Sequence, residues 1–281
     1  MIKVGIAGIG SMGLTHLDVY AKRKDARVIA VADPIPERRE GRTLTAGNIR
    51  GQAQGGADFR HFRKYADVHD LIADPEVQLV DICLPTPLHA PTAMAALKAG
   101  KHVLVEKPFA RTAKEAAALA RAADQAKTFL MCAMCMRFWP GWDWLKKTIE
   151  RKTFGKVLAA HFRRVASHPG RDFFLDGKAC GGALLDLHIH DADFVHFCFG
   201  KPKAVFSRGY SKQTSAVDHV LTHYLYDEVP LVTAEGGWAM APGFGFQMQY
   251  TVNFEQATAL FDLGASEPLR IVHQGKTRPV R

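Results

Sequence analysis

A glycine-rich turn near the N-terminus constrains the fold of this chain more than any other feature. Residues 8–13 have the pattern G-x-G-x-x-G. The residues of this turn that we expect to contact a nucleotide are Gly8, Gly10, Ser11, Met12 and Gly13. The apolar residues 2–7 before the turn predict a buried strand, and residues 14–20 after it predict a helix. A strand, a glycine turn and a helix in this order are typical of a dinucleotide-binding βαβ unit.

An acidic residue completes this pattern. The next apolar run, residues 28–32, ends in Asp33, which lies 20 residues after Gly13. A carboxylate here can accept hydrogen bonds from both hydroxyls of an adenosine ribose, while the glycines and the helix N-terminus accommodate the pyrophosphate. Asp33 favours NAD because it repels a 2′-phosphate, whereas the nearby Arg38 and Arg39 keep NADP open as the alternative cofactor.

Strand and helix patterns alternate over residues 1–133. The predicted strands cover residues 2–7, 28–32, 58–62, 78–84, 102–105 and 128–133, and further helices cover residues 90–99 and 113–126. This alternation predicts an α/β Rossmann domain with a parallel sheet that binds NAD(P). Ligands of such sheets lie beyond the carboxyl ends of the strands. The residues expected there, and therefore near the cofactor, are Leu84, Pro85, Thr86, His89, Glu106 and Lys107.

The pattern changes in the second half, residues 134–281. Two helices are predicted at residues 142–151 and 183–197. The predicted strands cover residues 157–165, 203–210, 219–227, 231–239, 246–254 and 258–263, and Pro242-Gly243 is a turn between two of them. These elements predict an α+β domain with an open, mainly antiparallel sheet, which we expect to bind the substrate and to form oligomers.

Asp186 and His190 are candidates for acid–base chemistry. On one continuous helix their spacing of four residues places them on the same face. A carboxylate beside a histidine orients the ring and suits it to act as a general base. The neighbouring His188 is two residues from His190, so the two rings point to different sides of a helix and do not converge on a metal ion. We expect no metal site.

Composition excludes several classes of function. The net charge of +9 is spread along the chain without a basic strip that alternates with aromatic residues, so nucleic acid is not an expected partner. No apolar run is long enough to span a membrane. The odd number of five cysteines, and a predicted strand that begins at residue 2, predict a cytoplasmic protein without a signal peptide.

Five motifs together resemble the Gfo/Idh/MocA family of oxidoreductases, which includes inositol dehydrogenases and glucose–fructose oxidoreductase. They are residues 8–13, 85–89, 100–108, 137–140 and 181–191. The resemblance covers essentially the whole chain. It implies an NAD(P)-dependent dehydrogenase that acts on CH–OH groups and transfers hydride between a secondary hydroxyl of a sugar, inositol or related polyol and the nicotinamide. Family members commonly continue into a further strand and helix beyond the position where this sequence ends.

The same resemblance implies roles for individual residues. Lys107, Asp186 and His190 correspond to the catalytic triad of the family. Candidate substrate contacts are Arg137, His89, Asp172 and Asp176. His188 stands where the family usually has a small residue, and we expect it to be either a substrate contact or a packed ring.

The resemblance also implies a homodimer or homotetramer that pairs through the second sheet. Aromatic residues expected on the open face of that sheet are Phe206, Tyr224, Tyr226, Trp238 and Tyr250. Three alternative functions remain: a keto-sugar reductase that runs the reaction backwards, a glycosidase that retains NAD, and a dinucleotide-binding regulator without turnover.

Overall fold

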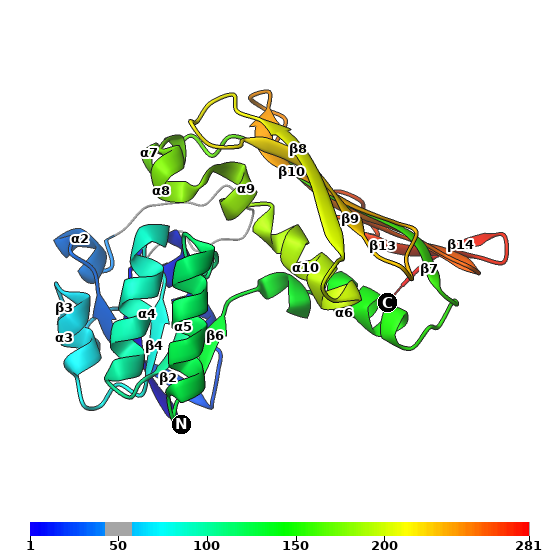
Figure 1. Ribbon diagram of the computed structural model, residues 1–281. Coiled ribbons are helices and arrows are strands. Elements are labelled where there is room, and N and C mark those ends of the chain that lie inside the picture. The colour runs from blue at the N-terminus through cyan, green and yellow to red at the C-terminus, as the bar shows by residue number, and fades with distance from the viewer. Residues whose placement is uncertain (43–57, 281) are drawn as a thin grey trace. The chain divides into compact units, whose positions relative to one another are not determined.

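The computed structural model describes residues 1–42 and 58–280 (Figure 1). Contacts within the chain divide it into two compact units, Met1–Ala133 and Met134–Arg281. Each unit has its own sheet and its own apolar core.

Unit 1 contains a six-stranded parallel sheet in the order β3-β2-β1-β4-β5-β6. Its strands are β1 (Ile2–Ala7), β2 (Ala26–Ala32), β3 (Arg63–Tyr65), β4 (Leu79–Ile82), β5 (His102–Val105) and β6 (Leu130–Cys132). Every residue from Val4 to Ala7 is buried, as expected of a central strand that is covered on both sides. The predicted Rossmann architecture is confirmed.

Helices connect these strands. They are α1 (Ser11–Tyr20), α2 (Pro36–Arg39), α3 (Val68–Ala73), the 3-10 turn η1 (Thr86–Leu88), α4 (His89–Lys98) and α5 (Ala113–Gln125). Helices α4 and α5 lie side by side (Figure 1). Thr112 and Glu115 form a capping box that begins α5. The strand predicted at residues 58–62 is wrong in position: Phe59 is buried in the core, and the β-pairing begins only at Arg63.

Unit 2 contains an eight-stranded sheet in the order β14-β13-β12-β11-β7-β10-β9-β8. Its strands are β7 (Val157–Ser167), β8 (Ala204–Tyr210), β9 (His219–Leu225), β10 (Leu231–Met240), β11 (Phe246–Phe254), β12 (Ala257–Asp262), β13 (Leu269–His273) and β14 (Lys276–Pro279). All neighbouring strands pair antiparallel except β7 and β10. The predicted mainly antiparallel sheet is confirmed. Although Pro242-Gly243 links β10 to β11, β7 lies between these two strands.

Helices cover one face of this sheet. They are η2 (Cys135–Phe138), α6 (Pro140–Glu150), α7 (Asp172–Leu175), α8 (Gly177–Cys180), α9 (Gly182–Asp186) and α10 (Ile189–Phe199). The core is built around Trp142 of α6, whose ring centroid lies 4.7 Å from that of Phe194 on α10 and 5.4 Å from that of Tyr250 on β11. Both contacts of Trp142 are edge to face, which is a favourable geometry for aromatic pairs.

Two predictions about unit 2 are wrong. The single helix expected at residues 183–197 is two helices, α9 and α10, because the chain turns at Leu187 and His188. Trp238 and Tyr250 are not on the open face of the sheet: they are 1% and 2% exposed, because their alternation along β10 and β11 directs them to the helix-covered face. Tyr224 and Tyr226 also pack against the core, so of the five aromatic residues only Phe206 is largely exposed.

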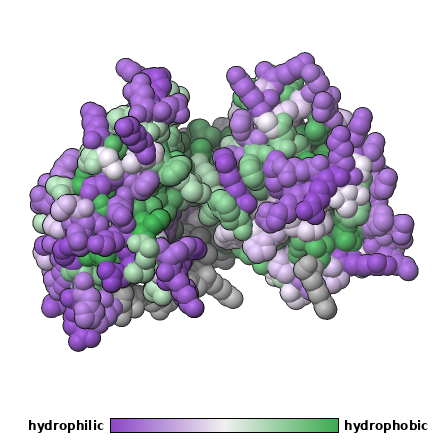
Figure 2. All heavy atoms as spheres, turned by 90° about the horizontal axis from the view of Figure 1, so that it is seen from below, coloured by the Kyte–Doolittle hydropathy of each residue, from purple (hydrophilic) through white to green (hydrophobic). Residues whose placement is uncertain are grey.

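Hydrophilic residues cover most of the face shown in Figure 2, with smaller apolar patches among them. None of the helices within residues 1–42 and 58–280 has the length and apolarity that a membrane span requires.

Candidate functional site

The glycine turn of unit 1 has the geometry of a nucleotide cradle. Gly8 has a φ of +92°, and a Cβ on it would lie 2.6 Å from the Cys83 carbonyl oxygen. A Cβ on Gly13 would clash with the Gly8 carbonyl oxygen, so the turn and α1 can pack only without side chains at these positions. Around Gly10, by contrast, nothing lies within 4 Å of such a Cβ. The backbone is therefore open to a phosphate there, directly before the first turn of α1.

Asp33 is held against this cradle. Its side chain is buried after the end of β2, where Oδ2 accepts a hydrogen bond from the Ile9 N–H at 2.9 Å and Oδ1 accepts one from the Ile35 N–H at 2.9 Å. Arg38 Nη1 lies 3.7 Å from Oδ2, and Arg39 Nη1 donates to the Asp33 carbonyl oxygen at 2.5 Å. The carboxylate is thus fixed in place, with two arginines beside it.

His89 joins the two loops that follow β4 and β5. One ring nitrogen lies 2.7 Å from the Leu84 carbonyl oxygen and the other lies 2.8 Å from the Pro108 carbonyl oxygen. The ring is 1% exposed, and Thr86 beside it is also buried. Both polar atoms of His89 are therefore occupied by the loops themselves, which makes this histidine a link between loops rather than a free side chain for a substrate.

Glu106 and Lys107 follow β5 at the carboxyl end of the sheet. Glu106 is 7% exposed, and its Oε2 accepts a hydrogen bond from the backbone N–H of Lys107 at 3.0 Å. The Lys107–Pro108 peptide bond is cis. Lys107 itself is only half-buried. A positive side chain at this edge of the sheet can stabilise negative charge that develops on a ligand.

Asp186 and His190 lie on either side of the break between α9 and α10. Asp186 is the last residue of α9, and α10 begins at Ile189. At the break, the His188 N–H donates to the Ala183 carbonyl oxygen at 2.8 Å, five residues earlier, so the helical repeat is locally widened. The regular i, i+4 geometry expected for this pair is therefore wrong. Both side chains are half-buried.

His188 is a packed ring. It is 2% exposed, and its Nε2 lies 3.3 Å from Thr222 Oγ1 on β9. It fills the space above Gly236 of β10, where a Cβ would lie 2.5 Å from His188 Nδ1. Burial lowers the pKa of His188 below its usual value, which favours the neutral ring. Of the two expectations for this residue, the structure supports packing.

The other candidate substrate residues have structural partners or stand at the surface. Arg137 Nε and Nη2 donate to the two carboxylate oxygens of Asp193 at 2.8 and 2.5 Å, and its guanidinium lies 4.9 Å from the ring centroid of Phe197. Asp176 caps α8 by accepting hydrogen bonds from the two following backbone N–H groups. Asp172 is exposed at the start of α7.

The sequence reasoning did not identify a charged cluster at the carboxyl edge of the unit 1 sheet. His16 of α1 lies between Asp81 of β4 and Glu106 after β5, with Cys83 close to its ring. These residues come from three separate segments of the chain. The only signal for this cluster in the sequence was the position of His16 shortly after the glycine turn. Asp81 is a polar residue inside an apolar strand, and its contact with His16 exists only in the folded sheet.

In comparisons with known proteins, each of the two units matches a protein-family model. Residues 2–134 match a family model described as "Oxidoreductase family, NAD-binding Rossmann fold". Residues 142–260 match a model described as "GFO/IDH/MocA C-terminal domain". The first match spans almost all of unit 1, and the second spans most of unit 2.

Named relatives are dehydrogenases. The chain is 30% identical to levoglucosan dehydrogenase of Pseudarthrobacter phenanthrenivorans over 210 residues, which are 73% of this chain and 53% of that protein. It is 29% identical to myo-inositol 2-dehydrogenase of Thermotoga maritima over 213 residues, which are 74% of this chain and 58% of that protein. The chain therefore spans only somewhat more than half the length of these relatives.

Solved structures share the fold. Levoglucosan dehydrogenase in complex with NADH and L-sorbose superimposes with a TM-score of 0.85 at 23% sequence identity, covering 99% of this chain and 79% of that one. An oxidoreductase from Agrobacterium radiobacter in complex with NAD+, L-tartaric acid and magnesium gives a TM-score of 0.84 at 19% identity, with the same two coverages. These likenesses concern the architecture of both units.

Proposed function

Because the chain belongs to the Gfo/Idh/MocA family of oxidoreductases, we propose that it is an NAD(P)-dependent dehydrogenase of a sugar, inositol or related polyol. The observation that carries this proposal is the cradle formed by the glycine turn and the fixed carboxylate of Asp33. The presence of Lys107, Asp186 and His190 in the matching motifs favours catalysis over a purely regulatory role. A cytoplasmic location is part of the proposal, and it is supported by the odd number of five cysteines.

Each catalytic residue has one task in this proposal. A nicotinamide held by the unit 1 cradle would supply the acceptor for the hydride that leaves the carbinol carbon. His190 takes the proton from the hydroxyl group as general base, and Asp186 orients its ring. Lys107 donates a hydrogen bond to the same oxygen and stabilises its negative charge while the carbonyl forms.

A panel of polyols and sugars tests this function and the choice of cofactor together. We expect NADH to form, seen by its absorbance, with at least one member of a panel that includes myo-inositol, levoglucosan and a cyclic trans-diol. Asp33 predicts a lower KM for NAD+ than for NADP+. Arg38 lies close enough to Asp33 to offset part of that carboxylate's repulsion, so NADP+ should retain measurable activity. No turnover in either direction, combined with tightly retained nucleotide, would instead favour a glycosidase or a regulator.

We further propose that two copies pair through the outer face of the unit 2 sheet. The exposed large hydrophobic side chains on this face of β8 and β9 are Phe206, Tyr210, Leu221 and Leu225, and Phe206 is 59% exposed. An apolar patch of this kind on an open sheet usually marks an interface. Light scattering is expected to give a wild-type mass of at least twice the 31.0 kDa of one chain. Phe206→Asp should lower the measured mass toward that of a single chain. A wild-type monomer at micromolar concentration would contradict this assembly.

A further inference from the structure

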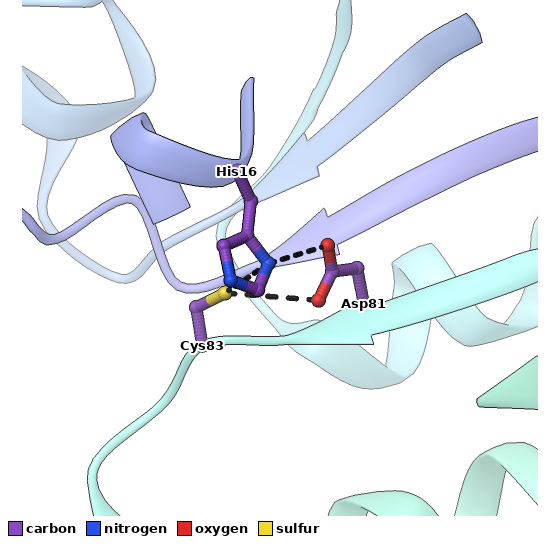
Figure 3. Close-up of side chains that lie close together, drawn as sticks. All are labelled: His16, Asp81 and Cys83. Atoms are coloured by element: carbon purple, nitrogen blue, oxygen red, sulfur yellow. Dashed lines mark hydrogen bonds and ion pairs between the residues drawn. The ribbon is translucent and has the colours of Figure 1, made fainter. Parts of the chain in front are cut away.

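The side chain of His16 is clamped between two buried carboxylates. From the second turn of α1 it points toward the carboxyl end of β4, where Nδ1 lies 2.8 Å from Asp81 Oδ2 (Figure 3). Its other nitrogen, Nε2, lies 3.0 Å from Glu106 Oε1. Asp81 is 0% exposed and Glu106 is 7% exposed, so little water reaches either contact.

This geometry determines the protonation of His16. Ionised carboxylate oxygens only accept hydrogen bonds, so each ring nitrogen must carry a proton to make its contact. Burial by itself lowers the pKa of His16, but the hydrogen bonds with Asp81, Cys83 and Glu106 outweigh burial and raise this pKa far above its usual value. The two contacts and the raised pKa both favour the imidazolium form of His16.

The groups that face this cation come from all the elements packed around it. They are Tyr20 on α1, Asp81 on β4, Cys83 directly after β4, and Glu106 after β5. Burial by itself raises the pKa of Glu106. The hydrogen bond from His16, the charge of His16 and the charge of Lys107 outweigh burial, so the pKa of Glu106 is lower than usual. The Glu106 carboxylate is thus kept ionised mainly by its contact with His16.

Glu106 transmits this contact to Lys107. Its Oε1 receives the His16 hydrogen bond, while its Oε2 accepts the backbone N–H of Lys107 at 3.0 Å. One rigid carboxylate therefore connects the imidazolium to the main chain that carries the lysine. We propose that His16 is a positioning residue: clamped as a cation between Asp81 and Glu106, it fixes Glu106 and, through it, the backbone of Lys107. The catalytic consequence rests on the role of Lys107 in the proposed function.

A second interpretation of the same cluster is a metal site, and the structure disfavours it. His16 Nδ1, an Asp81 carboxylate oxygen and Cys83 Sγ lie within 4.8 Å of one another, which is compatible with a metal ion. However, Nδ1 already lies at hydrogen-bond distance from Asp81, and a nitrogen that carries this proton cannot also bind a metal. Burial and the Asp81 charge also raise the pKa of the Cys83 thiol to about 12, so the metal-binding thiolate is disfavoured.

Nuclear magnetic resonance tests the clamp without an assay. In protein labelled with ¹⁵N-histidine, we expect both ring nitrogens of His16 to remain protonated from about pH 6 to pH 9, whereas an ordinary histidine loses its charge near pH 6.5. The signal is assigned by its loss in His16→Gln. In that folded variant the Lys107 amide proton should exchange faster with solvent than in the wild type, because Glu106 is no longer fixed. A neutral His16 ring at pH 8, or unchanged exchange at Lys107, would overturn the proposal.

Kinetics tests the consequence for Lys107. His16→Gln should lower kcat about 10- to 100-fold, with little change in the KM of the polyol. Because His16 acts through Lys107, adding His16→Gln to Lys107→Ala should cause no further loss, whereas independent additive losses would contradict positioning. His69→Gln is the matched control, because it replaces an exposed histidine of the same unit on α3, and it should keep wild-type kcat. A stoichiometric metal in the wild type that is lost in Cys83→Ser would establish the metal site instead. If Lys107→Ala itself leaves kcat unchanged, the proposed function of Lys107 fails, while the resonance and exchange results still decide whether the clamp exists.

Discussion

Replacing His190 with alanine is expected to lower kcat about 10²–10⁴-fold, while the affinity for the nucleotide stays close to that of the wild type. The reason is that His190 belongs to α10 of unit 2, whereas the glycine turn and Asp33 belong to unit 1. Removing the base affects proton transfer without touching the cradle. Steady-state kinetics and a fluorescence titration of NADH measure the two effects separately.

His196 offers a matched control for this experiment. It is an exposed histidine on the same helix, so His196→Ala removes an identical side chain without affecting the proposed base, and it should leave kcat unchanged. If His190→Ala kept more than about a third of wild-type kcat across the pH range, the base would have to be another residue. His89 and His188 would be poor substitutes, because both rings are buried and have structural partners.

Lys107→Ala belongs to the same experiment and should be at least as damaging as His190→Ala. It removes the positive charge that stabilises the developing negative charge on the substrate oxygen, and this electrostatic contribution is often the largest in an active site. Asp186→Asn should lower kcat less, because it keeps the shape of the side chain and removes only its charge. Equal kcat for wild type and Lys107→Ala would contradict the role of the lysine.

The sequence predicted the parts of the fold that depend on local patterns. The turn at residues 8–13, the acid at Asp33 and the apolar runs of the parallel strands are contiguous signals, and each lies at or within a few residues of its predicted position. Strands β13 and β14 were missed because the alternation in residues 269–279 is short and contains basic residues. Short segments of this kind gain their stability from the neighbouring strand rather than from their own pattern.

The structure corrected predictions that depended on tertiary context. The break at Leu187 and His188 has no proline to announce it, and His188 is accommodated there because Gly236 of β10 leaves room for its ring. Trp238 and Tyr250 were assigned to the wrong face of the sheet, because alternation shows that a strand has two faces but not which face the helices cover. The clamp joins His16 to two residues that lie 65 and 90 positions further along the chain, a contact that no local pattern encodes.

The largest effect on stability is expected from breaking the ion pair between Arg164 of β7 and Asp191 of α10. Arg164 Nε and Nη2 donate to the two carboxylate oxygens of Asp191 at 2.9 and 3.1 Å, and the side chains are 3% and 0% exposed. The guanidinium also lies 5.4 Å from the ring centroid of Trp142 in the core. Arg164→Met would leave the Asp191 carboxylate buried without its cation, so we expect the free energy of unfolding to fall by about 3–5 kcal/mol. Urea denaturation followed by tryptophan fluorescence measures this change.

Two further variants distinguish the destabilisation caused by a buried unpaired charge from the net contribution of the ion pair to the free energy of unfolding. Arg163, the preceding residue, points to the other face of the sheet and pairs with Glu235 in a half-exposed position, so Arg163→Met should lower the free energy of unfolding by only about 0–1 kcal/mol. The double variant Arg164→Met/Asp191→Leu removes both buried charges and should recover most of the stability lost by Arg164→Met alone, since an apolar pair avoids the desolvation of both ions. Two outcomes would contradict the view that the unpaired Asp191 charge causes the loss of stability. One is an equal loss in Arg164→Met and Arg163→Met, and the other is a double variant that is the least stable of the three.

Asp191 directly follows His190, so the pair also anchors the start of α10 to the sheet. A folded double variant with reduced kcat would then show that this anchor serves the position of the base as well as stability.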